Sequence, residues 1–372
     1  MRPGTSHISH VTSPDLLDWV RPEIRRLSAY HVPDASGLVK LDAMENPYHW
    51  PEDMLDAWLA ELRQVALNRY PDPAARELQA ALRQAMHIPD DAALLLGNGS
   101  DELIQLLALA LRHPEPGRDA VLLAPEPGFV MYRMIAEFVD MQYQGVALGP
   151  DFDLDADAML AAIEAHQPAL VFVAQPNNPT GNVYSEAALR KVVKAAPGWV
   201  VIDEAYAPFT DRDCLPWLNE YPNLLVMRTV SKMGLAGLRL GLLAGPPAMI
   251  AEVDKLRLPY NINVLTQASA RFALEHAEIF DAQAAHIRDD RAGLSEALSA
   301  IDGLQVFPSE ANFILFRTPA GRARELHQGL IEQGVLIKCL DGSHSRLTDC
   351  LRVTVGTGNE NKKFINALNT LM

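Results

Sequence analysis

Residues 224–245, LLVMRTVSKMGLAGLRLGLLAG, place two apolar runs on either side of a short turn that contains Lys232. The first run, 224–230, joins aliphatic and β-branched residues between polar neighbours, which predicts a buried strand. The second run, 238–245, follows almost at once. Burial would penalise the charge of a lysine placed between them. Lys232 is therefore either an ordinary surface-loop lysine or a lysine with a chemical role, and the rest of the chain decides between the two.

Outward from this stretch, apolar strands alternate with amphipathic helices from about residue 94 onward. Apolar segments such as ALVFVAQ (169–175) and WVVIDEAY (199–206) are followed or preceded by helical patterns such as SEAALRKVVKAA (185–196). This alternation predicts an α/β fold with a parallel sheet covered on both faces. In such sheets, ligands bind at the carboxyl ends of the strands.

The pattern changes after about residue 265, which indicates a second domain. A long helical stretch (266–300) precedes several short apolar runs and two more helices, as expected for an α+β arrangement. We expect three parts: an N-terminal arm with part of the small domain (1–60), a large domain (61–265) and a C-terminal small domain (266–372).

Composition excludes several classes of function. The 372 residues carry a formal charge of −15, which disfavours binding to nucleic acid or to anionic membranes. No apolar run is long enough for a signal peptide or a membrane span. Three widely spaced cysteines (Cys214, Cys339 and Cys350) suit a reducing cytoplasm and argue against a zinc site. His7 and His10 fit a flexible leader better than metal ligands, so we expect a cytoplasmic protein without a metal.

Four polar features lie where the parallel-sheet rule predicts a ligand. Each has a simpler interpretation: a turn, a helix cap, a serine N-cap or a loop lysine. A dinucleotide fingerprint is excluded because Glu102 occupies the position of its third glycine. The four features are PNNPTG (176–181), DEAY (203–206), GNGSDEL (97–103) and SKMGLAGLR (231–239).

Taken together, the four features supply what pyridoxal phosphate requires. This cofactor needs a lysine for its Schiff base, a carboxylate facing its ring nitrogen, an aromatic neighbour and a phosphate cradle. A buried lysine has a lowered pKa, which makes it a usable nucleophile and general base. The predicted set is Lys232 for the Schiff base, Asp203 for the ring nitrogen, Asn178 and Tyr206 for the phenolate oxygen, Phe129 for the ring face, and Gly99, Ser100, Asp101, Thr229, Ser231 and Arg239 for the phosphate.

PNNPTG, DEAY and SK…GLAGLRLG, in this order and spacing, resemble the class I/II aminotransferases, which have the aspartate-aminotransferase-type fold. The likeness runs from LSAYHVPD (27–34) to CLRVTVGT (350–357). It implies a large domain with a mainly parallel, seven-stranded sheet and a smaller α+β domain. It also implies that Lys232 forms an aldimine with pyridoxal phosphate, with Asp203 and Tyr206 as further catalytic residues.

Within this family, MENPY (44–48), NRYPDP (68–73) and LPYNIN (258–263) resemble members that transfer the amino group of L-histidinol phosphate to 2-oxoglutarate, in histidine biosynthesis. The resemblance implies a homodimer, in which Tyr70 of the partner subunit reaches the cofactor phosphate. The chain departs from the family in two places: it has one residue fewer than many relatives between Lys232 and Arg239, and it has Lys338 where several relatives carry an arginine. The implied substrate-binding residues are Tyr30, Asn46, Tyr260, Lys338, Arg346 and Arg352.

Alternatives remain at this point. Tyr30, Tyr70 and Tyr260 could be packed or rim aromatics, and Arg352 could form a surface ion pair. The enzyme could be an aromatic or general amino-acid aminotransferase, or a decarboxylase of threonine phosphate. A non-catalytic regulatory module is a further hypothesis, against which the acidic charge and the lack of a basic helix-turn-helix segment both count.

Overall fold

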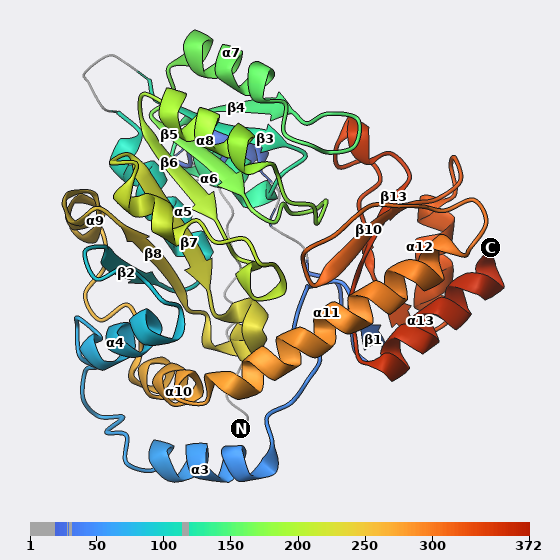
Figure 1. The fold of residues 1–372 in the computed structure, drawn as a ribbon, viewed down its shortest axis with the longest axis horizontal. Helices are drawn as coiled ribbons and strands as arrows, with labels where there is room; N and C mark the ends of the chain where they lie inside the picture. Colours follow the sequence, from blue (N-terminus) through green and yellow to red (C-terminus); the bar gives the residue numbers. More distant parts are fainter. Residues whose placement is uncertain (1–18, 28, 30–31, 114–118) are drawn as a thin grey trace, which may run out of the picture. The chain divides into compact units, whose positions relative to one another are not determined.

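The computed structural model describes residues 19–27, 29, 32–113 and 119–372, and Figure 1 shows its fold. The chain divides into two compact units, residues 1–34 and residues 35–372. The first contains the short helix α2 (Pro22–Arg26), and all strands of the described residues belong to the second. His7, His10 and Tyr30 lie outside the described residues.

The larger sheet has seven strands in the order β2-β8-β7-β6-β5-β3-β4. The five strands from β7 to β4 are parallel, whereas β8 is antiparallel to both of its neighbours, β7 and β2. This confirms the predicted mainly parallel sheet. The strands are β2 (Ala93–Gly97), β3 (Val121–Glu126), β4 (Gln142–Ala147), β5 (Leu170–Ala174), β6 (Trp199–Asp203), β7 (Leu224–Thr229) and β8 (Gly241–Gly245).

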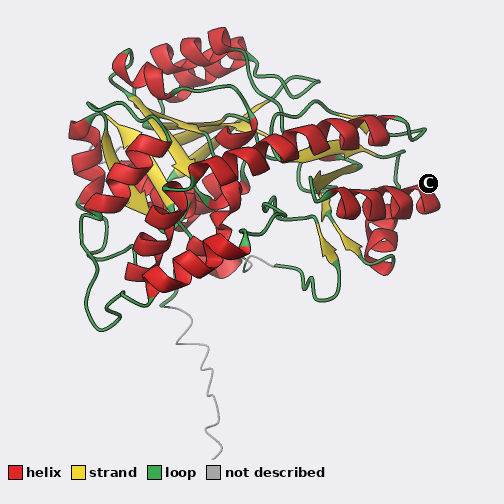
Figure 2. Ribbon diagram, turned by 60° about the horizontal axis from the view of Figure 1, so that its bottom comes forward, coloured by secondary structure: helices red, strands yellow, loops and turns green. Residues whose placement is uncertain are grey.

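Helices cover both faces of this sheet, which explains why its central strands are apolar throughout. Leu225 and Met227 of β7 face one core and Leu224 and Val226 face the other, as the alternation of side chains along a strand requires. Figure 2 shows the sheet with helices above and below it. One core includes α5 (Ser100–Leu111), α6 (Val130–Phe138) and α9 (Pro247–Asp254), and the other includes α4 (Arg76–Ala85), α7 (Ala156–His166) and α8 (Glu186–Ala195).

The C-terminal part forms a four-stranded antiparallel sheet, β12-β13-β10-β9, as predicted for an α+β arrangement. Phe313, Phe316, Leu351 and Phe364 are fully buried in its core. A separate two-stranded ribbon pairs β1, near the start of the second unit, with β11. The elements are β1 (Val39–Lys40), β9 (Gln305–Val306), β10 (Phe313–Arg317), β11 (Val335–Leu336), β12 (Lys338–Cys339), β13 (Cys350–Thr354), α11 (Ala277–Ser299), α12 (Ala323–Glu332) and α13 (Gly358–Leu371).

The predicted helical stretch 266–300 consists of two helices, α10 (Val264–Leu274) and α11, because the chain turns at Glu275 and His276. Helix α10 packs against α3 (Glu52–Leu62) and α4. The domain boundaries at residues 60 and 265 stay predictions. Among the described helices, we find none with the length and apolar composition that a membrane crossing requires.

Candidate active site

A pocket lies where β5, β6 and β7 end and α5 begins, the edge of the sheet at which the parallel-sheet rule predicts a ligand. Segments far apart in sequence meet there, including residue 44 and residue 239. Most of the predicted cofactor residues line it. The lining is Met44, Ser100, Asp101, Phe129, Ala174, Pro176, Asn178, Asp203, Ala205, Tyr206, Thr229, Ser231, Lys232 and Arg239.

Lys232 follows β7 on a helical turn (Ser231–Leu235) that aims its amine into the pocket. Its Nζ donates a hydrogen bond to the backbone oxygen of Ala43 at 3.3 Å and lies 5.9 Å from the ring centre of Tyr206. Burial, with the nearby positive charge of Arg352, lowers the pKa of Lys232 to about 8. The neutral, nucleophilic amine is therefore accessible near physiological pH, unlike that of a surface lysine.

Asp203 ends β6 and is 4% exposed. Its carboxylate accepts hydrogen bonds from the Tyr132 hydroxyl at 2.6 Å and from the Ala205 amide at 3.1 Å. Burial raises the pKa of Asp203 to about 6, and the two hydrogen bonds oppose this rise because they stabilise the charged form. The carboxylate is therefore ionised at neutral pH and held in a fixed orientation.

Tyr132 is a site residue that sequence reasoning missed. It lies on α6, three positions after Phe129, so the two side chains share one face of the helix. Their rings meet edge to face with centres 5.5 Å apart. Once Phe129 is placed against a ring, this helical spacing is the signal that could have found Tyr132.

Asn178 links Tyr206 to Arg352. Its amide nitrogen donates to the Tyr206 hydroxyl at 3.1 Å, and its amide oxygen accepts from Arg352 at 2.6 Å. Arg352 also donates to the backbone oxygen of Asp42 at 3.1 Å and is 6% exposed. Burial raises the pKa of Tyr206, while Arg352 acts against this rise. The burial of Arg352 excludes the alternative of a surface ion pair.

A cradle for an anion forms where α5 begins. Gly99 precedes the helix with a φ of 80°, and the backbone amides and dipole of α5 favour negative charge at this end. The hydroxyls of Thr229 and Ser231 lie 2.9 Å apart in the same pocket. The Arg239 guanidinium lies 3.4 Å from the Asp101 carboxylate. Its positive charge compensates the negative charge of Asp101 beside the cradle.

Tyr70 and Tyr260 stack on each other, with ring centres 4.5 Å apart and planes 16° apart. They are 80% and 41% exposed, and neither lines the pocket of its own chain. Their roles stay predictions, and that of Tyr70 depends on a second subunit.

Of the other predicted substrate residues, Asn46, Lys338 and Arg346 are not among those that line the pocket. The amide nitrogen of Asn46 donates to the backbone oxygen of Met233 at 3.0 Å and to Gln283 at 2.9 Å, so this side chain fixes the lysine turn. Lys338 lies directly opposite Arg352 in the β12–β13 pairing. Arg346 donates to the backbone oxygen of Gly149 at 3.3 Å and is absent from the pocket lining.

The sheet order and the lysine at its strand ends define the class of the protein: an α/β protein with the aspartate-aminotransferase-type fold. Solved structures show the same fold. The histidinol-phosphate aminotransferase of Sinorhizobium meliloti, in complex with pyridoxal-5'-phosphate, superposes with a TM-score of 0.83 at 24% identity over 94% of this chain and 96% of that one. For the Clostridium acetobutylicum histidinol-phosphate aminotransferase these values are 0.81, 23%, 90% and 98%.

The chain belongs to the family of class I and II aminotransferases, whose sequence pattern matches residues 36–368. Curated relatives agree over nearly their full length. Histidinol-phosphate aminotransferase 2 of Nitrosococcus oceani is 56% identical over 358 residues, which is 96% of this chain and 98% of that protein. The histidinol-phosphate aminotransferase of Chromobacterium violaceum is 54% identical over 349 residues, or 94% and 96% of the two chains.

Proposed function

We propose that this protein is a pyridoxal-phosphate-dependent transaminase. It converts L-histidinol phosphate and 2-oxoglutarate into imidazole-acetol phosphate and glutamate, in the cytoplasm, as a step of histidine biosynthesis. The observation that carries the proposal is one pocket that combines a lysine of lowered pKa, a buried carboxylate and a helix N-terminus. Relatives more than 50% identical that are named histidinol-phosphate aminotransferase support the substrate.

The residues present fit pyridoxal phosphate. Gly99 leaves room beside the cradle, because a Cβ at this position would lie 2.6 Å from the Arg239 guanidinium. Ser231, Thr229 and Arg239 would hold the cofactor phosphate, Phe129 would lie against the ring, and the amine of Lys232 would hold the aldehyde end of the cofactor. When bound, the cofactor supplies an aldehyde that takes up amino groups and a ring that accepts electrons from the substrate α-carbon.

On the protein, Asp203, Asn178 and Lys232 each have a separate role. Asp203 is ionised above a pKa of about 6, so it keeps a proton on the ring nitrogen that faces it. Asn178 and Tyr206 donate hydrogen bonds toward the phenolate oxygen. The neutral amine of Lys232 removes the proton from the substrate α-carbon, and its lowered pKa keeps this base available near pH 8.

Arg352 and Lys338 supply the positive charge for the anionic end of the substrate. Two cations directly opposite each other on neighbouring strands repel, and an anion bound between them offsets that repulsion. Within the described ranges Lys338 takes part in no ion pair, which leaves its charge available to a ligand. Such a pair could accept a phosphate in one half-reaction and a carboxylate in the other.

A homodimer completes the proposal. Tyr70 is the most exposed of a group of apolar side chains around α3, α9 and α10, and a second copy of the chain would cover them. Tyr70 of the partner subunit would then reach the cofactor phosphate. The exposed group includes Leu59, Leu67, Tyr70, Leu256, Leu258, Tyr260 and Leu265.

The proposal is tested by following the visible spectrum of the cofactor-loaded protein during separate additions of histidinol phosphate, phenylalanine and histidine. Histidinol phosphate is expected to convert the cofactor to its amino form, and 2-oxoglutarate is expected to reverse the change. Conversion by phenylalanine alone would favour an aromatic aminotransferase. Release of carbon dioxide from threonine phosphate would favour the decarboxylase. Lys232→Ala is expected to abolish the Schiff-base absorption, and a normal spectrum in this variant would contradict the assignment of the lysine.

A further inference from the structure

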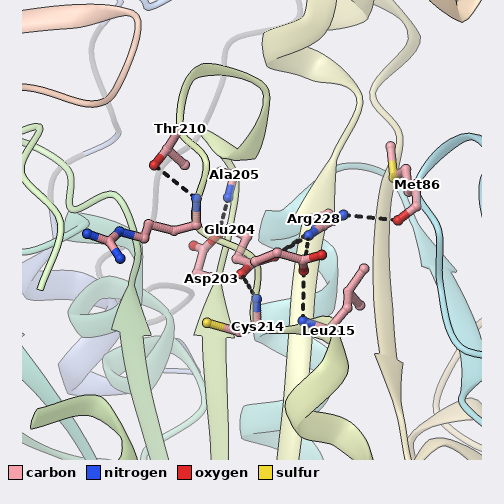
Figure 3. A network of polar contacts seen from close by, with 10 residues as sticks. Met86, Asp203, Glu204, Ala205, Thr210, Cys214, Leu215 and Arg228 are labelled. Carbon is pink, nitrogen blue, oxygen red and sulfur yellow. Dashed lines mark hydrogen bonds and ion pairs between the residues drawn. The ribbon is translucent and has the colours of Figure 1, made fainter. Parts of the chain in front are cut away.

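A buried ion pair joins the end of β6 to the end of β7, and Figure 3 shows the network around it. Glu204 is 1% exposed and follows Asp203, and Arg228 precedes Thr229. The guanidinium of Arg228 contacts the Glu204 carboxylate through two nitrogens, at 2.8 Å and 2.7 Å. Nothing in the proposed chemistry uses either side chain directly.

The pair joins four segments of the chain. Arg228 also donates to the backbone oxygen of Met86, after α4, at 3.3 Å and to Asp213 at 2.8 Å. The second oxygen of Glu204 accepts from the Cys214 amide at 2.7 Å. The loop that follows β6 is thereby tied to β7 by charged contacts, and each of the three guanidinium nitrogens of Arg228 contacts a protein acceptor.

The two strand ends lie between two pockets. Asp203 lines the candidate active site, Glu204 and Arg228 line a separate hollow, and Thr229 lines both. Asp203 is aligned with Met227 in the β6–β7 pairing, and the Glu204 amide donates to the backbone oxygen of Met227 at 2.8 Å. Fixing Glu204 to Arg228 therefore also fixes the residues beside them, Asp203 and Thr229.

We propose that Glu204 and Arg228 are positioning residues that hold Asp203 and Thr229, the ring-nitrogen partner and a phosphate ligand, in the register that cofactor binding requires. This inference rests on the proposed function, because both held residues are assigned to the cofactor. The pair acts through geometry and through charge, because Arg228 is paired with the Glu204 carboxylate that adjoins Asp203. Neither residue touches substrate or cofactor.

The charges of Glu204 and Arg228 predict a pH-dependent effect that a pair with a merely structural role would not produce. The Glu204 carboxylate raises the pKa of Asp203, so an uncompensated Glu204 would raise it further. An uncompensated Arg228 would act in the opposite direction. The two single variants should therefore shift the pH midpoint of the bound cofactor's visible band in opposite directions: upward for Arg228→Gln, which removes a positive charge, and downward for Glu204→Gln.

The experiment compares Arg228→Gln, Glu204→Gln and the double variant with wild-type protein. The readouts are the dissociation constant of pyridoxal phosphate for the apo-protein, the pH midpoint of the visible band, and the melting temperature. Arg190→Gln is the matched control, because Arg190 also joins several partners, including Glu186 and Glu220, but contacts no residue of the site. Each single variant is expected to weaken cofactor binding roughly 10- to 100-fold, as loss of an outer partner does at metal sites.

The double variant is expected to bind the cofactor no more weakly than the worse single variant and to return the midpoint toward the wild-type value. It buries no unpaired charge, so it remains informative if a single variant fails to fold. Wild-type cofactor affinity and midpoint in all three variants, with only a lowered melting temperature, would overturn the inference. Failure of the wild-type apo-protein to bind pyridoxal phosphate would instead overturn the proposed function.

Discussion

At the scale of single residues, the ionisation of Asp203 depends on two opposing causes. Burial disfavours its carboxylate, and the Tyr132 hydroxyl stabilises it through a 2.6 Å hydrogen bond. Hydrogen bonds to a charged acceptor are stronger than neutral ones, at about 1.5–3 kcal/mol. Tyr132 thus keeps Asp203 ionised in surroundings that would otherwise protonate it near neutral pH.

Replacing Tyr132 with phenylalanine removes this hydrogen bond and keeps the ring, which is stacked on Phe172 with centres 4.6 Å apart. We expect the pKa of Asp203 to rise above about 6, so the acid limb of the pH profile of kcat/KM should move to higher pH. Each 1.4 kcal/mol of lost stabilisation raises this pKa by about one unit, so activity at pH 6.5 should fall roughly threefold for the first unit and about tenfold for each further unit.

Tyr184→Phe is the matched control. Tyr184 is 1% exposed and, among the residues that the structure describes, its hydroxyl has no hydrogen-bond partner. Removing that hydroxyl should leave the acid limb in place. An unchanged pH profile in Tyr132→Phe would show that the Tyr132 hydroxyl does not govern Asp203.

Residue types were more readily predicted than their contacts. Lys232 and Asp203 could be predicted because each polar side chain lies at or just after the end of an apolar strand, and the fold brings such strand ends together. The roles of Tyr132 and of the Glu204–Arg228 pair could not be predicted from the sequence. In the sequence, Tyr132 looks like an ordinary core aromatic and the pair looks like surface charges. Only the pairing of strands 24 residues apart in sequence reveals that Glu204 and Arg228 meet.

At the scale of elements, the close approach of β8 to the start of α5 depends on Gly241. A Cβ at Gly241 would lie 2.7 Å from backbone atoms of Gly99 and Ser100, a distance at which the backbone must move. Gly237 lies in the same turn region, but nothing lies within 4 Å of a Cβ placed there. The two glycines therefore allow a matched comparison.

Gly241→Ala should push β8 away from the cradle and weaken the binding of pyridoxal phosphate to the apo-protein. A displacement that costs about 1.4 kcal/mol corresponds to tenfold weaker binding, and we expect at least this loss. Gly237→Ala should leave the dissociation constant within about twofold. Equal affinities in a fluorescence titration of the two variants would contradict the steric role of Gly241.

The alternation of strands and helices in the large sheet could be predicted because each buried strand is a short, fully apolar run. The antiparallel direction of β8 could not, since an apolar run carries no sign of its direction. The pairing of β1 with β11 joins residues 296 positions apart, Val39 with Val335, and two-residue strands give almost no periodic signal. The break between α10 and α11 lacks the glycine or proline that usually marks a helix end.

At the scale of the whole molecule, Asp203 and Lys232 make the apo-protein's stability depend on pH. The raised pKa of Asp203, about 6, means that its charge costs stability as pH rises from about 4 to 6, and the full cost persists above that range. The lowered pKa of Lys232, about 8, means that its charge costs stability at all pH values below about 8, and this cost disappears as pH rises further. Both costs are complete between about pH 6 and 8.

Cofactor binding should therefore raise the melting temperature most between about pH 6 and 8, where it offsets both costs. In apo-protein, Asp203→Asn should remove most of the loss of stability between pH 4 and 6, on the order of 3 kcal/mol for a shift of about two pKa units. Calorimetry of apo- and cofactor-loaded protein across pH 4 to 10 measures both effects. An Asp203→Asn profile parallel to that of wild type would contradict this assignment.

The proposed dimer predicts complementation between two defective subunits. Lys232→Ala lacks the lysine, and Tyr70→Phe impairs the site of its partner, so a hybrid of the two contains one intact site. Mixing the variants under conditions that exchange subunits should restore activity well above that of either variant alone. Hybrid dimers, verified by mass, that remain as inactive as Lys232→Ala would exclude a role for Tyr70 across the interface.

The antiparallel strand β8 also sets the order of events during synthesis on the ribosome. Strand β2 and the start of α5 are made early, but β8 is the strand that joins β2 to β7, and so brings Ser100 into one pocket with Thr229. The nascent chain therefore has no complete phosphate cradle until residue 245 has emerged. Capture of the cofactor must therefore follow the pairing of β8 with β2 and β7, so the cofactor cannot serve as a template for the strands made before β8.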